Sequence, residues 1–208
     1  MSSLHVDLIA PLVGVAPLGH ATLRSEHVIS AGPSFDAVLP DGGLRRGSVV
    51  LLEECSVGMT TMVMSLLGGL PERTWAAWVD MRRSLNGIAL EEHGVDLEHL
   101  LVVRDVPAAM WTRTVSSLLD AMSVVVAELD GHLSVGDARR LVARARERRS
   151  VLVVMERGRA RWPVEAGVRC RVESMSMTLG MNDAGLGGYS CQVKVSARGV
   201  PKVLQLVS

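Results

Sequence analysis

Apolar positions along the chain gather in short blocks rather than being spread evenly. Five continuous apolar runs recur between residues 49 and 155, and segments that we predict to be helical separate them. Continuous apolar runs are typical of strands buried on both faces of a parallel sheet. The pattern therefore predicts an α/β fold with a mainly parallel sheet flanked by helices. The expected strands are 49–52, 75–79, 100–103, 124–127 and 151–155, and the expected helices are 34–39, 61–67, 84–93, 108–122 and 134–149.

The last forty residues follow a different pattern. Apolar and polar residues alternate from 168 to 173 and again from 189 to 196, and a final apolar run covers 203–207. Gly187-Gly188 and Arg198-Gly199 mark turns on either side of the second run. Alternation with period two is typical of antiparallel strands that expose one face. We expect a C-terminal antiparallel meander that extends the parallel sheet.

Length and composition restrict the class of protein. The 208 residues predict one domain, residues 29–208, preceded by an irregular N-terminal arm, residues 1–28. A hydrophobic content of 48% with formal net charge +0 excludes a disordered chain, and any nucleic-acid surface must then be a local patch. No run has the length of a membrane span, no signal-peptide pattern opens the chain, and three widely spaced cysteines indicate a reducing compartment. We expect a cytoplasmic protein.

The stretch from Gly47 to Met62 combines a predicted strand, a loop and a helix start, which is where a P-loop belongs. The P-loop pattern is G-x-x-x-x-G-K-[ST], and Gly58 and Thr60 match its last glycine and its hydroxyl. Glu53, however, stands in place of the first glycine, and Met59 in place of the lysine. A working loop surrounds phosphates with backbone N–H groups and one ammonium. The stretch therefore predicts the architecture of an ATPase without its reaction.

Several further motifs resemble the core of bacterial RecA recombinases over residues 29–172. They are Phe35-Asp36, Leu39-Pro40-Asp41-Gly42-Gly43-Leu44, Arg46-Gly47 and the segments 75–80 and 94–101. The short chain and the Gly-Tyr…Arg-Gly-Val-Pro tail are most similar to the ImuA-type accessory proteins of inducible mutagenesis. The cell-division inhibitor of the SOS response is a more distant relative.

The resemblance implies a RecA-like P-loop core and a role in SOS-induced translesion DNA synthesis. It also implies two partners, an inactive Y-family polymerase homologue of the ImuB type and an error-prone replicative-type DNA polymerase. Association with the nucleoid on DNA damage would follow. A homo-oligomer is a further expectation.

Residues at the family's working positions depart from its mechanism. The phosphate lysine falls on Met59, the first glycine of the loop on Glu53, and the glutamate that activates water on Arg82. A guanidinium cannot act as that general base. The acidic end of the fourth strand is Glu128 rather than an aspartate. We therefore expect no ATP hydrolysis, no catalytic residue, no cofactor and no metal site.

Two sets of residues are candidates for binding. Arg157, Arg159, Arg161 and Trp162 follow the fifth strand, where the resembling recombinases carry a DNA-binding loop, and arginines with an aromatic suit contact with single-stranded DNA. A solvated surface is the alternative for these residues and for the arginines of helix 134–149. Unusually apolar segments at both ends are the candidate partner-binding residues: Leu8, Ile9, Leu12, Val203, Leu204, Leu206 and Val207.

The leading hypothesis is a non-catalytic RecA-like adaptor in error-prone repair. One alternative is a RecA-like ATPase in which Lys194 or Lys202 of the tail replaces the missing lysine. Another is an SOS regulator that blocks a cell-division protein. The sequence alone leaves all three open.

Overall fold

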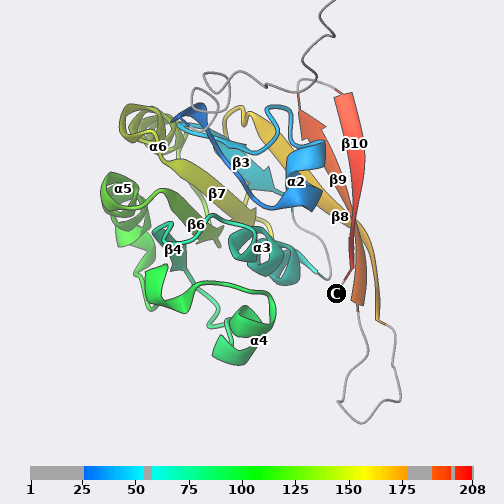
Figure 1. Ribbon diagram of the computed structural model, residues 1–208. Helices are drawn as coiled ribbons and strands as arrows, with labels where there is room; N and C mark the ends of the chain where they lie inside the picture. Colours follow the sequence, from blue (N-terminus) through cyan, green and yellow to red (C-terminus); the bar gives the residue numbers. More distant parts are fainter. Residues whose placement is uncertain (1–25, 54–57, 178–188, 198–199, 208) are drawn as a thin grey trace, which may run out of the picture.

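The structure, a computed structural model, describes residues 26–53, 58–177, 189–197 and 200–207. Within these residues an eight-stranded sheet has the order β10-β9-β8-β3-β7-β6-β4-β5 (Figure 1). Its strands are β3 (Val49–Leu52), β4 (Ala76–Val79), β5 (Leu100–Val103), β6 (Val124–Leu129), β7 (Val151–Glu156), β8 (Val168–Met177), β9 (Tyr189–Ala197) and β10 (Val200–Val207). The helices are α2 (Pro33–Val38), α3 (Met59–Gly68), α4 (Gly87–Glu92), α5 (Trp111–Ala121) and α6 (Val135–Arg148), with short 3-10 turns η1 (Leu97–His99) and η2 (Ala108–Met110).

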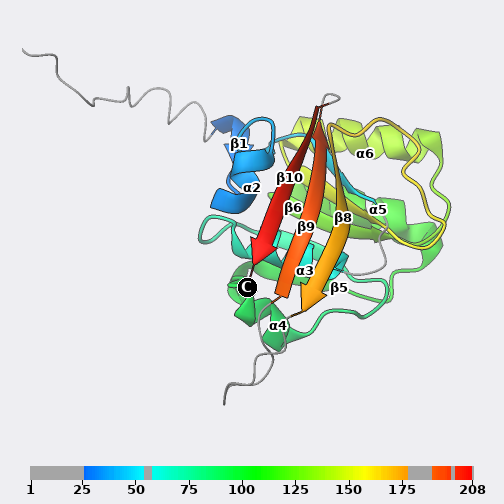
Figure 2. The same ribbon diagram turned by 90° about the vertical axis from the view of Figure 1, so that its right-hand side faces the viewer.

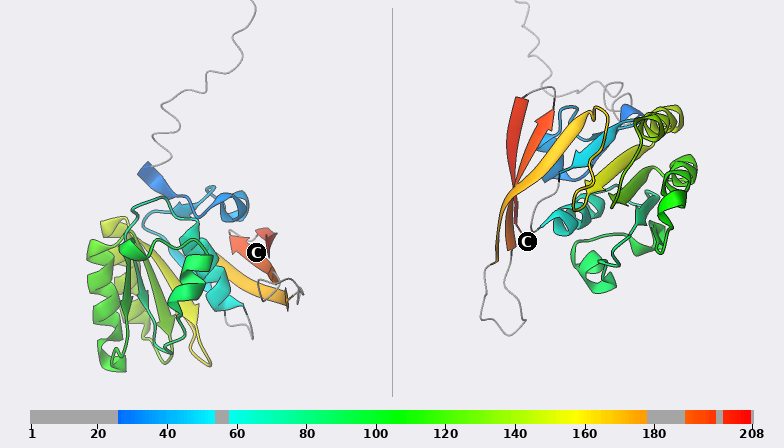
Figure 3. Two further views of the ribbon diagram at one scale, coloured as in Figure 1. Left: turned by 60° about the horizontal axis from the view of Figure 1, so that its bottom comes forward. Right: turned by 180° about the vertical axis from the view of Figure 1, so that it is seen from behind.

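Helices cover both faces of the sheet. The buried side chains of α2, α3 and α4 form one apolar cluster with alternate residues of the strands, and those of α5 and α6 form a second cluster on the opposite face. In β3, for example, Val50 and Leu52 belong to the first cluster, and Val49 and Leu51 to the second. The view from the end of the sheet shows the layers (Figure 3, left). Burial on both faces explains why these strands are continuous apolar runs.

The mixed α/β fold with a mostly parallel sheet confirms the coarse prediction from the sequence. The five predicted strands of the core are β3 to β7, which pair in parallel with their neighbours. The predicted Ser134 cap is also present, since its Oγ accepts a hydrogen bond from the N–H of Asp137 at 3.0 Å. A two-stranded antiparallel ribbon of β1 (Val28–Ile29) and β2 (Leu44–Arg45) was not predicted, because two-residue strands carry no periodicity.

The C-terminal strands extend the sheet as an antiparallel meander, as expected, since β9 pairs antiparallel with β8 and β10 (Figure 2). The meander joins the core through β8, which pairs parallel with β3. A parallel neighbour requires the chain to return from one end of the sheet to the other. Residues 157–167 make that return without a helix, and their apolar side chains Ala160, Trp162, Val164 and Ala166 join the cluster of α5 and α6. The chain therefore covers this face of the sheet partly with an extended strap.

Two glycines allow the end of α3 to contact other backbone segments directly. A Cβ atom on Gly69 would lie 2.1 Å from the carbonyl oxygen of Ala31, and one on Gly68 would lie 1.8 Å from that of His93. Both distances are far below any van der Waals contact. These contacts hold α3 between the start of α2 and the end of α4.

Gly69→Ala should destabilise the protein by about 1–3 kcal/mol, because the added methyl forces backbone segments apart. Urea unfolding followed by circular dichroism measures this free energy. Gly87→Ala is the matched control, since a Cβ atom at that position would have no other atom within 4 Å. The control should be neutral or stabilising by about 0.5–1 kcal/mol, as replacement of a helical glycine allows. Equal destabilisation by both substitutions would contradict the packing described for Gly69.

Candidate functional site

The candidate site lies at the carboxyl ends of the central parallel strands. Ligands of open α/β sheets bind at this edge, where connections from neighbouring strands leave to opposite faces. Here α3 follows β3 on one face, whereas the strap follows β7 on the other. Glu128 near the end of β6 and Arg157 directly after β7 meet Thr60 of α3 at this point.

The Glu128 carboxylate is completely buried and fully engaged. Arg157 donates to its Oε1 from Nη2 at 2.6 Å and from Nε at 3.1 Å, and the backbone N–H of Arg82 donates to Oε2 at 3.1 Å. The Arg157 side chain is only 12% exposed. The carbonyl oxygen of Glu128 accepts a hydrogen bond from Nε1 of Trp111 at 2.8 Å. A buried charge requires this kind of compensation, since an unpaired one costs several kcal/mol.

Arg157 also reaches the start of α3. Its Nη2 lies 3.1 Å from the Thr60 hydroxyl oxygen, the group that matches the last position of the P-loop pattern. Met59 begins α3 and is 2% exposed within the apolar cluster of that face. The N-cap Gly58 has φ +90°, a left-handed conformation that glycine adopts readily. The cation beside this helix start therefore comes from the segment after β7 and not from the helix itself.

Other carboxylates at this edge also have basic or backbone donors. Asp80, fully buried at the end of β4, accepts from Arg104 Nε at 3.0 Å and from the Ser84 N–H at 2.8 Å. Arg82 pairs with Asp130 at 3.2 Å, so the side chain at the expected glutamate position is an ion-pair partner. Glu53, in place of the first P-loop glycine, lies 3.5 Å from Arg169. Acidic and basic groups at this edge therefore neutralise one another.

The four predicted DNA-binding residues do not form one exposed surface. Arg157 is engaged with Glu128, and Trp162 is 5% exposed, with its ring in the apolar cluster of α5 and α6. Arg161 donates to the carbonyl oxygens of Gly158 and Ala160 at 3.0 and 2.6 Å. Arg159 is exposed, and among the described residues its side chain has no partner. DNA binding stays a prediction, and Arg159 is the member of the set that faces solvent.

The tail lysines have other surroundings. Lys194 of β9 lies 3.7 Å from Glu173, and Lys202 of β10 is exposed. The cation that contacts the α3 hydroxyl is Arg157, which the sequence did not suggest for this position. Of the candidate partner-binding side chains, the structure describes only Val203, which is 60% exposed. The other six lie outside the described side chains, and Leu8, Ile9 and Leu12 lie outside the described residues altogether.

Among the described residues, we find neither a reactive cysteine nor a metal site at the carboxyl edge of the sheet. Burial, followed by the charge of Glu53, raises the pKa of Cys170 to about 12, so this thiol is inert at neutral pH. Cys55 lies outside the described residues. Within those residues, no group of three His, Cys, Asp or Glu side chains could hold a metal ion. The described helices are also too short or too polar to cross a membrane.

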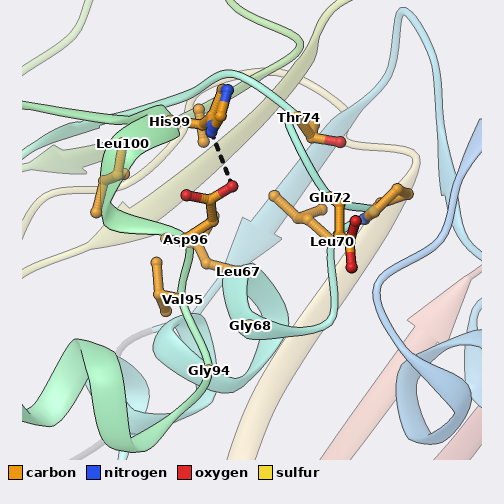
Figure 4. Close-up of a pocket in the computed structure, with 12 residues that line it drawn as sticks. Leu67, Gly68, Leu70, Glu72, Thr74, Gly94, Val95, Asp96, His99 and Leu100 are labelled. Atoms are coloured by element: carbon orange, nitrogen blue, oxygen red, sulfur yellow. Dashed lines mark hydrogen bonds and ion pairs between the residues drawn. The ribbon is translucent and has the colours of Figure 1, made fainter.

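A cavity of about 150 Å³ lies at the amino edge of the sheet, opposite to the Glu128–Arg157 network and beside the end of α3 (Figure 4). The imidazole of His99 and the carboxylate of Asp96 face each other there, with Nδ1 2.8 Å from Oδ2. Asp96 also accepts from the N–H of Glu98 at 3.1 Å, which caps η1. These contacts organise the turn before β5, and we assign no chemistry to them.

Comparison with known proteins shows the family to which the chain belongs. Residues 37–164 match the family described as the MT3502 N-terminal domain, over more than half of the chain. The chain belongs to this MT3502 family. The matched segment contains β3 to β7 and all members of the Glu128–Arg157 network, whereas β8 to β10 lie beyond it. No curated protein matches the chain.

Arg157→Met should destabilise this MT3502-family protein by about 3–5 kcal/mol, because it leaves the Glu128 charge buried without its cation. Denaturant unfolding measures the change. Arg159→Met is the matched control, two residues away and exposed, and its effect should stay within about 0.5 kcal/mol. Combining Arg157→Met with Glu128→Leu should recover part of the loss, since both charges are then removed. A mild effect of Arg157→Met alone would show that Glu128 does not depend on it.

Proposed function

We propose that the protein is a non-catalytic RecA-like adaptor in SOS-induced, error-prone translesion DNA synthesis. In this proposal it binds an inactive Y-family polymerase homologue, which in turn works with an error-prone replicative-type DNA polymerase. The proposed localisation is the cytoplasm, and the protein would associate with the nucleoid on DNA damage. The observation that supports the non-catalytic part is the closed contact among Glu128, Arg157 and Thr60.

Nucleotide hydrolysis needs free charges of both signs at this edge. A cation must contact the phosphates, and a carboxylate and a hydroxyl must hold the magnesium ion. In this protein the cation and the carboxylate bind each other, and the same guanidinium contacts the hydroxyl of Thr60. A nucleotide would have to displace a salt bridge that is almost completely buried. The network supports an ATPase-like architecture that has lost its substrate.

Two further residues agree with this interpretation. Met59 occupies the expected lysine position and packs in the core, so it offers no charge to a phosphate. Arg82 occupies the expected glutamate position and pairs with Asp130. We infer that the segment between β3 and α3 descends from a phosphate-binding loop. That inference uses the resemblance to RecA-like proteins together with the position of the loop after a central parallel strand.

The proposed binding to a polymerase-like partner rests on the resemblance to ImuA-type accessory proteins. β10 is the last strand of the described sheet and α2 packs beside it, so only the part of β10 that α2 leaves uncovered can contact another chain. Val203 on this strand is a large aliphatic side chain that is 60% exposed. Exposed apolar side chains at a sheet edge are typical contact points for a protein partner. A second copy of the chain is the alternative occupant.

Purified protein should show no rise in melting temperature with millimolar ATP and magnesium. A ligand that binds only the folded state stabilises it by mass action, by about 2.7 kcal/mol at one hundred times its Kd. Differential scanning fluorimetry with increasing ATP measures the shift, and an active ATPase serves as positive control. A saturable shift that disappears in Gly58→Val would contradict the non-catalytic proposal and favour the ATPase alternative.

Val203→Arg should lower the yield of the co-expressed polymerase-like partner in a pull-down. Placing a charge at the centre of an apolar contact typically weakens binding by more than about 1 kcal/mol, which is roughly fivefold or more. Ile88→Arg is the matched control, since Ile88 is 66% exposed and lies on α4, outside the C-terminal strands. Parental yield with Val203→Arg, in a protein that melts at the parental temperature, would remove β10 from the proposed interface.

A further inference from the structure

An open cavity of about 560 Å³ lies at the edge of the sheet opposite to the Glu128–Arg157 network. The turn between β2 and β3, the last turns of α6 and the segment that leads into β8 line it. Apolar side chains of Val142, Ala166 and Val168 contribute to its lining. Three arginines also line it: Arg45, Arg46 and Arg146.

A close backbone contact brings these arginines together. Gly47 has φ +78°, and a Cβ atom on it would lie 3.1 Å from the Cα atom of Arg146. The N–H of Gly47 also donates to the carbonyl oxygen of Ser150 at 3.0 Å. The turn therefore lies directly against the end of α6. Arg46 directly precedes Gly47 in the turn, and Arg146 is the residue of α6 that Gly47 contacts. Both arginine side chains therefore border the same cavity.

Three arginines of α6 have carboxylate partners. Arg140 and Arg144 pair with Asp137 and Asp120, and Arg148 shares Asp120. Hydrogen bonding with Arg144 accordingly lowers the pKa of Asp120. Among the residues that the structure describes, Arg45, Arg46 and Arg146 have no carboxylate within ion-pair distance. Arg46 is half-buried, and a partly desolvated guanidinium is favourable chiefly beside an anion.

The cavity adjoins the point where the N-terminal segment joins the fold. The carbonyl oxygen of His27 accepts from the N–H of Arg46 at 2.8 Å, and that of Glu26 accepts from the Arg149 guanidinium. Glu26 and His27, with which the described residues begin, therefore lie beside Arg46 and Arg149.

We infer that this cavity is the docking site for an acidic segment of the partner protein that also carries apolar side chains. The inference rests on the proposed adaptor function. Guanidinium groups bind carboxylates through two parallel hydrogen bonds, and arginine is enriched at protein interfaces. The apolar lining accommodates aliphatic side chains between the acidic ones.

A nucleic-acid strand fits this cavity less well than a peptide. The lining also contains Glu165, whose carboxylate would repel a continuous row of phosphates. The described residues that line it include no aromatic side chain on which a base could stack. A peptide can place a basic or neutral residue near Glu165 and acidic residues near the arginines. The mixed charge therefore favours a protein segment.

The test uses the full chain and a fluorescein-labelled peptide in which glutamates flank single leucines. Fluorescence anisotropy should show saturable binding by the parent protein and about tenfold weaker binding by the double variant R46Q/R146Q, since each lost charge-assisted hydrogen bond contributes appreciably. R140Q is the matched control on the same helix, where Arg140 is 79% exposed and already paired. R140Q should bind like the parent. All variants should melt at the parental temperature, and R45E, at an exposed position, replaces the double variant if that protein does not fold.

Three results would overturn the inference. They are equal peptide affinity of parent and R46Q/R146Q, no binding of the peptide by the parent, and binding of labelled oligothymidylate in place of the peptide at the same arginines. Pull-down of the polymerase-like partner distinguishes failure of the proposed docking site from failure of the proposed function. A partner retained at parental yield by R46Q/R146Q contradicts the docking site and leaves the adaptor function intact. Peptide binding that depends on the arginines, without any polymerase-like partner in the pull-down, supports the docking site and contradicts the adaptor function.

Discussion

A carboxylate without access to water needs a cation beside it, and this requirement ties together four loops of the protein. Glu128 takes its cation from the end of β7 and its second donor from the backbone after β4, and the same cation contacts the start of α3. The alternative to this arrangement is an uncompensated buried charge, which proteins rarely tolerate. Buried ion pairs add little net stability compared with apolar packing, whereas loss of one partner leaves an uncompensated charge and is strongly destabilising.

The two edges of the sheet differ in how their charges are used. At the carboxyl edge, Asp80, Glu128 and Asp130 each have an arginine partner within the chain. At the amino edge, the arginines around Gly47 lack such partners among the described residues. An edge with internal neutralisation has little electrostatic attraction for an external ligand, whereas an edge with uncompensated guanidiniums attracts anions. Among the described residues, the fold thus places its uncompensated positive charge at the amino edge of the sheet.

The sequence was sufficient to predict the parallel core, because burial on both faces produces continuous apolar runs in β3, β4, β6 and β7. It was not sufficient for the partners of individual charges. Arg157 and Glu128 are 29 residues apart, and no local pattern distinguishes Arg157 from the exposed Arg159. Trp162 looked suitable for stacking on a base, yet it covers the sheet, because the strap that leads to β8 has no helix to supply apolar side chains. The pairing of β8 with β3 was left open for a related reason, since an extended strap gives no periodic signal.

The position of β3 has a consequence for how the chain folds during synthesis. β3 pairs with β7 and β8, and Val49 lies opposite Leu152. Both strands that will flank β3 leave the ribosome about a hundred residues after it. At translation rates of roughly 5–20 residues per second, the apolar strand waits on the order of 5–20 s for its neighbours. Such long-range parallel pairing is intrinsically slow and exposes apolar surface in the meantime. The central strand of the parallel core thus gains its neighbours late, so its apolar surface stays uncovered for much of the synthesis of this chain.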